Sequence, residues 1–156
     1  GVVHDPTREE LFSAVRGEGA FLNGERLGLR PGPELAEALV GTGFSYDSER
    51  RAAQGRLVSS VLPAVRDIRR AGAAAIDLCW VAAGRLDAFY ESDLAPWDHA
   101  AGSLVVREAG GSAEELGGLL GGEPTLVAAA PGLGEHLAAL LVAASGPPRG
   151  PDARPW

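Results

Sequence analysis

Two acidic residues, Glu91 and Asp98, are the clearest candidates for chemistry in this sequence. Glu91 follows an alternating apolar run that is typical of a β-strand, and Asp98 follows the Pro96-Trp97 turn at the start of an apolar helical pattern. We therefore expect the two side chains to face one another across a short loop. Carboxylates in such a corner can accept hydrogen bonds from hydroxyl groups or offer hard oxygen ligands to a divalent cation.

Residues 69–111 must position this corner, and their pattern predicts a helix, a short strand, a turn and a second helix. The first helix is expected to open at Gly72 and to stop at Gly84, which has no Cβ and suits a helix end. Its core face holds Ile76, Cys79, Trp80 and Ala83. A strand is expected at residues 86–90. The second helix is expected to begin with Asp98 as its N-cap and to end at Gly110-Gly111.

The bulk composition indicates a soluble globular domain, or part of one. The 156 residues are 46% hydrophobic and 22% charged, and the net charge of −7 comes from 21 acids against 14 bases, all of them arginine. An acidic surface without a basic stripe argues against nucleic-acid binding. No apolar run reaches membrane-spanning length, so no membrane association is expected. The single Cys79 excludes an internal disulfide, which favours a cytoplasmic location.

The start of the sequence has an unusual feature. The chain contains no methionine, and it opens on an apolar strand at Val2-Val3 that runs straight into the Asp5-Pro6 turn. We therefore expect that the natural polypeptide has residues ahead of Gly1.

Strand and turn patterns predict an antiparallel meander in the first part of the chain. Strands are expected at residues 2–3, 10–15 and 20–22, and Asn23-Gly24 is a strong hairpin signal because both residues tolerate positive φ. Such a sheet needs a covering partner for its apolar face.

From about residue 38 to residue 143 strand and helix patterns alternate, which predicts a layered α/β half. A helical or irregular link at residues 35–39 leads to strands at 38–44, 67–70 and 125–129. Helices are expected at 48–62 and from Pro131 onward, and residues 112–124 read as a loop. The expected core residues of these two helices are Ala52, Leu57, Val58, Val61, Leu62, Leu133, Leu137, Leu140 and Leu141. The fold class is thus a layered α+β sandwich over residues 1–144, followed by a disordered tail at 145–156.

An ordered set of motifs extends across most of the chain. The central motif is Trp97-Asp98-His99-Ala100-Ala101-Gly102, followed by Glu108-Ala109-Gly110-Gly111. Supporting motifs are Gly1 to Pro6, Gly17 to Gly24, Arg70-Ala71-Gly72-Ala73-Ala74, Asp77-Leu78-Cys79, Val81 to Asp87, and Val127 to Leu133. This set resembles the inositol monophosphatase family, the magnesium-dependent, lithium-sensitive phosphatases related to fructose-1,6-bisphosphatase. The resemblance covers about residues 1–143.

The resemblance implies roles for several residues. Asp98 matches an aspartate that helps to hold a second Mg²⁺, and Glu91 matches an acid that hydrogen-bonds substrate hydroxyl groups. Gly72, Ala73 and Ala74 match backbone that lines the substrate pocket. The implied substrate is a small phosphorylated polyol or sugar such as inositol monophosphate, and the family commonly forms homodimers.

The sequence also departs from the family pattern. Members carry a Gly-Glu-Glu segment and an Asp-Pro-(Ile/Leu)-Asp-Gly-Thr motif, which supply most metal ligands and the water-activating threonine, and neither occurs here. We therefore expect this chain to carry part of an active site and to be inactive alone.

Several alternatives remain open at this point. Asp98 can serve only as a helix cap, and Glu91 can be an ordinary solvated charge. Gly72-Ala73-Ala74 can reflect close helix packing alone. The whole chain can be a non-catalytic binding or dimerising module. A third hypothesis is a sister phosphatase that acts on fructose-1,6-bisphosphate, histidinol phosphate or 3′-phosphoadenosine 5′-phosphate.

Other polar and aromatic residues near the corner are expected to be structural. Asp77 is predicted to be a helix-surface acid and Asp87 a turn acid, while His99 is expected to face away from the site. Cys79 should be an inert core thiol, and Trp80 and Trp97 are expected to be packing anchors.

Overall fold

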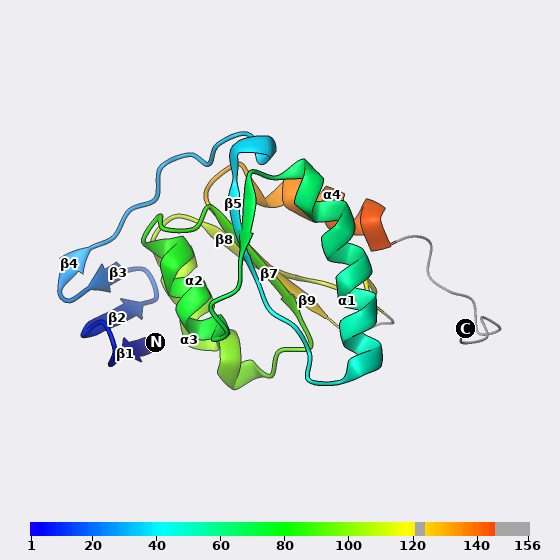
Figure 1. The fold of residues 1–156 in the computed structure, drawn as a ribbon. Coiled ribbons are helices and arrows are strands. Elements are labelled where there is room, and N and C mark those ends of the chain that lie inside the picture. Colours follow the sequence, from blue (N-terminus) through cyan, green and yellow to red (C-terminus); the bar gives the residue numbers. More distant parts are fainter. Residues whose placement is uncertain (121–123, 146–156) are drawn as a thin grey trace.

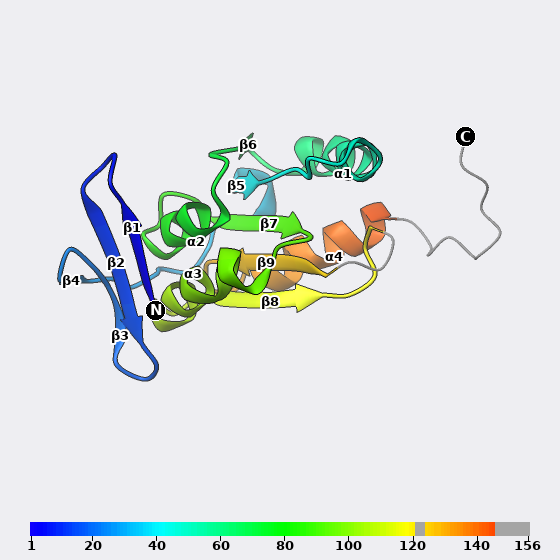
Figure 2. The same cartoon turned by 90° about the horizontal axis from the view of Figure 1, so that it is seen from below.

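The chain folds into alternating layers of sheet and helix. The structure is a computed structural model, and it describes residues 1–120 and 124–145. A four-stranded antiparallel sheet forms one outer layer, and a pair of helices separates it from a five-stranded mixed sheet (Figure 2). Further helices cover the opposite face of the second sheet (Figure 1). The predicted layered α+β sandwich, in which an antiparallel meander precedes an α/β layer, is therefore confirmed.

The first sheet is the predicted meander with one additional strand. Its strands run in the order β1 (Val2–Asp5), β2 (Glu10–Val15), β3 (Gly19–Leu22) and β4 (Glu25–Arg26). Asn23 and Gly24 both have positive φ, 50° and 85°, which confirms the hairpin signal. The strand β4 was not predicted because two charged residues carry no strand pattern. The inward-facing apolar residues of this sheet are Val3, Phe12, Ala14 and Ala20.

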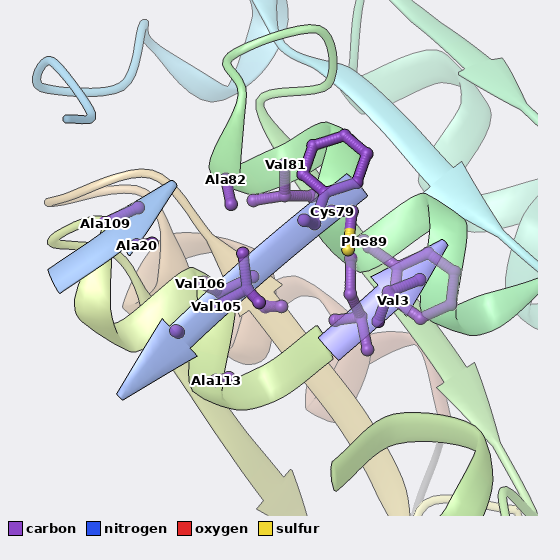
Figure 3. Packing of buried hydrophobic residues seen from close by; sticks show 14 of the residues in the cluster. Val3, Ala20, Cys79, Val81, Ala82, Phe89, Val105, Val106, Ala109 and Ala113 are labelled. Atoms are coloured by element: carbon purple, nitrogen blue, oxygen red, sulfur yellow. The ribbon is translucent and has the colours of Figure 1, made fainter. Parts of the chain in front are cut away.

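The helix pair between the sheets consists of α2 (Ala74–Ala82) and α3 (Pro96–Glu108). The two helices are in contact at Gly102, where an added Cβ would lie 2.7 Å from Leu78 Cβ. Apolar residues from both helices and both sheets form one core around them (Figure 3). Only a small residue permits this contact, so Gly102 sets how closely the two site-bearing helices pack.

The second sheet has the strand order β6-β5-β7-β9-β8. Strand β5 (Leu39–Thr42) runs parallel to β6 (Asp67–Arg69) and β7 (Ala88–Ser92), whereas β9 (Thr125–Ala129) is antiparallel to β7 and to β8 (Ser112–Leu116). The prediction of a loop at 112–124 was wrong for residues 112–116, which form β8. This edge strand contains two exposed glutamates, and among the described residues it pairs with β9 alone, so it carries no apolar signal. Residues 121–123 lie outside the described part.

Helix α1 (Ser48–Val61) covers the far face of this sheet, and its core side differs from the prediction. Leu57 and Val61 are buried as expected, but Ala52 and Leu62 are exposed. Gln54 faces inward instead, because its Oε1 accepts a 2.8 Å hydrogen bond from the backbone N–H of Ser45. Val58 is half-buried, and the short helix η2 (Leu62–Ala64) continues beyond α1.

The last helix, α4 (Gly134–Ser145), packs beside α1. It begins after Pro131 rather than at it, because Gly132 has a φ of 84° that no right-handed helix accommodates. Leu133, Leu137 and Leu141 are buried and Leu140 is half-buried, as predicted. The link η1 (Leu35–Glu37) is a short 3₁₀ helix. Of the predicted tail, Ser145 closes α4, and residues 146–156 lie outside the described part.

Candidate functional site

A cleft of about 450 Å³ opens where β5, β7 and the N-terminal ends of α2 and α3 meet. All five residues predicted for the site line it: Gly72, Ala73, Ala74, Glu91 and Asp98. Residues widely separated in the sequence thus lie around one hollow. The further lining residues are Gly43, Phe44, Ser45, Tyr46, Arg70, Ala75, Ser92, Asp93, Leu94 and Trp97.

The start of α2 presents uncapped backbone to this cleft. Gly72 has a φ of 94°, so it precedes the helix rather than opening it, and the helix begins at Ala74 instead of at the predicted residue. Ala73 takes the N-cap position, where its methyl group cannot accept a hydrogen bond. The amides of Ala74 and Ala75, in the first turn, therefore have no intrahelical acceptor and are available to a ligand.

Glu91 lies within β7, which runs to Ser92, and its side chain is half-buried. Its carboxyl group covers Gly43, because a Cβ added to that glycine would lie 2.1 Å from the carboxylate atoms. Burial first, and then the charge of Asp77, raise the pKa of Glu91 to about 7, against the opposing effect of Arg70. Near neutral pH this carboxyl group can therefore either accept or donate a hydrogen bond.

Asp98 is the third helical residue of α3, not its N-cap. Pro96 occupies the first helical position, where its missing N–H is not needed, and Ala95 is the N-cap. Asp98 Oδ2 accepts a 2.9 Å hydrogen bond from the backbone N–H of Ala95. The side chain therefore caps the helix from inside while it lines the cleft. Its Oδ1 accepts no hydrogen bond within the described residues.

Asp77 contradicts its prediction as a helix-surface acid. Its side chain is 1% exposed, and its Oδ1 has no hydrogen-bond partner within the described residues. The prediction failed because the strand that covers this face of α2, β5, is brought there only by the tertiary fold. Burial raises the pKa of Asp77 to about 6, although a hydrogen bond from the Ala73 backbone and the charge of Arg70 oppose this effect.

Asp77→Asn is expected to stabilise the chain at high pH and not at low pH. Because the folded pKa of about 6 exceeds the unfolded value of 3.8, the folded state binds more protons between these values, and rising pH lowers the free energy of unfolding. Asn removes this loss of stability, so the gain in the free energy of unfolding should grow between pH 3.8 and pH 6 and reach about 3 kcal/mol at pH 8. Urea unfolding at pH 4 and at pH 8 measures it. An equal effect at both pH values would contradict the assignment.

The remaining predictions near the corner had mixed outcomes. Trp97 is not a packing anchor, because 84% of its surface is exposed at the rim of the cleft. Trp80 does pack against the core, with the Arg8 guanidinium 4.8 Å from its ring centroid. Asp87 is structural, since its Oδ2 accepts a 2.7 Å hydrogen bond from the backbone N–H of Leu39.

His99 and Cys79 behave as expected. His99 Nε2 lies 3.6 Å from a Glu115 carboxylate oxygen on β8, away from the cleft. Cys79 is fully buried, and burial raises the pKa of its thiol to about 12, which keeps it unreactive.

Sequence reasoning missed the charged residues at the rim of the cleft. Arg70 reaches back over Gly72, and Asp93 pairs with Arg50 of α1. The Arg-Arg pair before Gly72 was visible in the sequence, but no local pattern shows that Arg70 faces the cleft. The pairing of Asp93 with Arg50 joins residues 43 positions apart, which only the tertiary fold brings together.

Comparison with known proteins decides the family. The family model described as the inositol monophosphatase family matches residues 1–145. This chain belongs to the inositol monophosphatase family. An inositol-1-monophosphatase from Mycobacterium leprae is 45% identical over an alignment of 147 residues that covers 90% of this chain and 50% of that protein. The Nus factor SuhB of Escherichia coli K12 is 43% identical over 138 residues, covering 82% of this chain and 52% of that protein.

Solved inositol monophosphatase folds agree with the structure. Mycobacterium tuberculosis SuhB superposes with a TM-score of 0.84 at 44% identity, covering 94% of this chain and 59% of that one. The inositol monophosphatase from Anabaena sp. PCC 7120 superposes with a TM-score of 0.81 at 31% identity, and the match covers 95% of this chain and 59% of that one. The chain thus spans about half the length of the relatives it matches.

The acidic residues of the cleft fit one part of a metal site. Mg²⁺ binds through one or two carboxylates and completes its coordination with water and phosphate oxygens. Asp98 has an oxygen available for such a bond, and its other oxygen is fixed by the Ala95 amide. Within residues 1–120 and 124–145 no group of three His, Cys, Asp or Glu side chains is placed to hold a metal. In the same part of the chain no helix is long and apolar enough to cross a membrane.

Proposed function

We propose that this chain forms the substrate-facing part of a Mg²⁺-dependent phosphomonoesterase that hydrolyses inositol monophosphate or a related small sugar or polyol phosphate. The supporting observation is that Glu91, Asp98 and the uncapped start of α2 line one cleft in a member of the inositol monophosphatase family. Because the chain carries one candidate metal ligand, we expect it to be inactive alone.

In this proposal each side of the cleft has a separate task. Asp98 would be a ligand of Mg²⁺, and the bound metal would supply activated water and charge stabilisation for a phosphate in an in-line displacement. Glu91 would accept hydrogen bonds from hydroxyl groups of the polyol. The amides of Ala74 and Ala75 would donate to oxygen atoms of the substrate, where the dipole of α2 favours a negative charge.

Several finer expectations accompany this proposal. Lithium should inhibit the activity, as the family resemblance implies. A homodimer remains a prediction. The buried, unpaired Cys79 is compatible with a cytoplasmic location.

The test is phosphate release by the intact polypeptide that contains this chain. Inositol 1-phosphate, fructose-1,6-bisphosphate, histidinol phosphate and 3′-phosphoadenosine 5′-phosphate are compared with and without Mg²⁺, and with added Li⁺. The proposal expects Mg²⁺-dependent release, with inositol monophosphates among the better substrates and no release by the 156-residue chain. Better turnover of another member of the panel would favour a sister phosphatase. No release from any substrate would overturn the proposal.

A non-catalytic binding role is the second candidate, and the names of relatives favour it. Proteins of Pasteurella multocida and Escherichia coli that are 46% and 43% identical are each named Nus factor SuhB. For this reason the expectation that the chain has no nucleic-acid partner stays a prediction. An intact polypeptide that lacks phosphatase activity but binds a protein or RNA partner with defined stoichiometry would support this role.

A further inference from the structure

The strand under Glu91 provides a floor without side chains. Gly41 lies on β5, and Gly43 directly follows the last strand residue, Thr42. Gly41 pairs with Phe89 of β7, and Phe89 and Glu91, two residues apart on β7, point to the same face of the sheet. A Cβ at Gly43 would lie 2.1 Å from the Glu91 carboxylate, and one at Gly41 would lie 3.5 Å from Asp77 Oδ1. The two carboxyl groups therefore lie over β5 and the residue that follows it, in space that larger residues would fill. We call these two positions the glycine floor.

Asp77 enters this space from α2, and its environment is unusual for an acid. The side chain is 1% exposed and Oδ1 has no hydrogen-bond partner within the described residues. Such a group costs stability, so its presence points to a role other than stabilising the fold. The groups that act electrostatically on Glu91 are Asp77 from α2, Arg70 from the preceding segment and Asp98 from α3. Strand β5 contributes no ionisable residue beneath it.

We propose that Asp77 is a positioning residue for Glu91: over the glycine floor it holds the Glu91 carboxyl group at the cleft and sets the pH range in which Glu91 is charged. Two carboxylates over this floor repel one another, so the pair keeps a proton to higher pH than a free carboxyl group does. When the second proton leaves, repulsion from buried Asp77 turns the Glu91 carboxylate toward the cleft. The ligand of Glu91, a hydroxyl group of the substrate, is taken from the proposed function. The coupling between the two acids does not depend on catalysis.

The test is a pH titration of the Glu91 carboxyl carbon by ¹³C NMR, in this chain and in its Asp77→Asn variant. Asn removes the negative charge and keeps the shape, so the Glu91 midpoint should fall by about one pH unit. The matched control is Asp67→Asn on β6, an acid paired with Arg69 outside the cleft, which should leave the Glu91 midpoint within about 0.2 units of wild type. An unchanged midpoint in a folded Asp77→Asn chain overturns the proposal.

A second variant tests the floor independently of Asp77. Gly43→Ala places a methyl group where the Glu91 carboxylate lies, so the carboxyl group must move into the solvent of the cleft. Its midpoint should then drop toward the ordinary value of about 4.3. Circular dichroism confirms that the variant is folded. A Gly43→Ala midpoint equal to that of wild type overturns the role of the floor, even if Asp77→Asn fails to fold.

These titrations test the coupling between the two acids independently of the proposed function, because they are recorded without substrate or metal. An intact polypeptide without phosphatase activity, in which the Glu91 midpoint still shifts, would overturn the enzyme and keep the acid pair. In an active polypeptide, Asp77→Asn should move the acid limb of the kcat/KM profile to lower pH by the same amount. An unshifted acid limb would overturn the positioning role.

Discussion

Replacing Asp98 by Asn in the intact polypeptide is expected to lower Mg²⁺-dependent phosphate release about 100-fold or more, which corresponds to about 3 kcal/mol of transition-state stabilisation. The physical reason is that an amide oxygen is a neutral and weaker ligand for Mg²⁺ than a carboxylate. The fold should survive, because the Asn oxygen can still accept the hydrogen bond from the Ala95 amide. The rate is measured over a range of Mg²⁺ concentrations, and part of the loss should be recovered at high Mg²⁺.

Asp47→Asn is the matched control for this substitution. Asp47 is the N-cap of α1, where its carboxylate accepts from the amides of Glu49 and Arg50, and Asn caps a helix equally well. This variant should retain both activity and stability. If Asp98→Asn had the activity of Asp47→Asn, Asp98 would be only a helix cap and the metal assignment would be wrong.

Replacing Gly102 by Val is expected to lower the free energy of unfolding by about 3 kcal/mol or more. An added Cβ would lie 2.7 Å from Leu78 Cβ and 3.3 Å from the carbonyl oxygen of Ala75, and neither atom is at the end of a flexible side chain. The helices α2 and α3 must therefore separate. Because α2 carries Ala74 and α3 carries Asp98, the same shift should disturb the cleft. Urea unfolding, followed by circular dichroism, measures the loss.

The same substitution at Gly55 separates this effect from helix propensity. Gly55 is an exposed position of α1, and an added Cβ there meets no atom within 4 Å. Gly55→Val should leave stability unchanged or raise it by a few tenths of a kcal/mol, because Val is a better helix former than Gly. Equal losses at Gly55 and Gly102 would show that backbone preference, not the contact between α2 and α3, causes the effect.

Local patterns in the sequence were sufficient for the regular elements with strong apolar signals. The strand β2 and the hairpin at Asn23-Gly24 were predicted correctly, since turn chemistry and alternation depend on neighbouring residues alone. The short strands β4 and β8, whose exposed residues are all charged, were not predicted. The edge strand β8 was missed because its pairing with β9 has no counterpart in its own composition. Gln54 was missed in the core because its hydrogen bond to Ser45 depends on a loop outside α1.

The membership of the candidate site was determined by the sequence. The ordered motifs around Trp97-Asp98 and Gly72-Ala73-Ala74 named five residues, and all five line one cleft. They could be named because the resemblance to the family is carried by residue identities in ordered motifs, which can be matched without knowing how the chain packs. What each of these residues does remains a proposal.

The environment of the site was decided by the tertiary structure alone. Asp77 is buried rather than exposed because β5 packs over α2, and Trp97 is exposed rather than buried because no element covers it among the described residues. Gly41 and Gly43 leave the space in which Asp77 of α2 and Glu91 of β7 lie over β5 and the residue that follows it. A pKa depends on burial and on neighbouring charges, and both are properties of packing between distant segments. The sequence therefore determined which residues gather at the cleft, and only the fold decided which of them are desolvated and coupled.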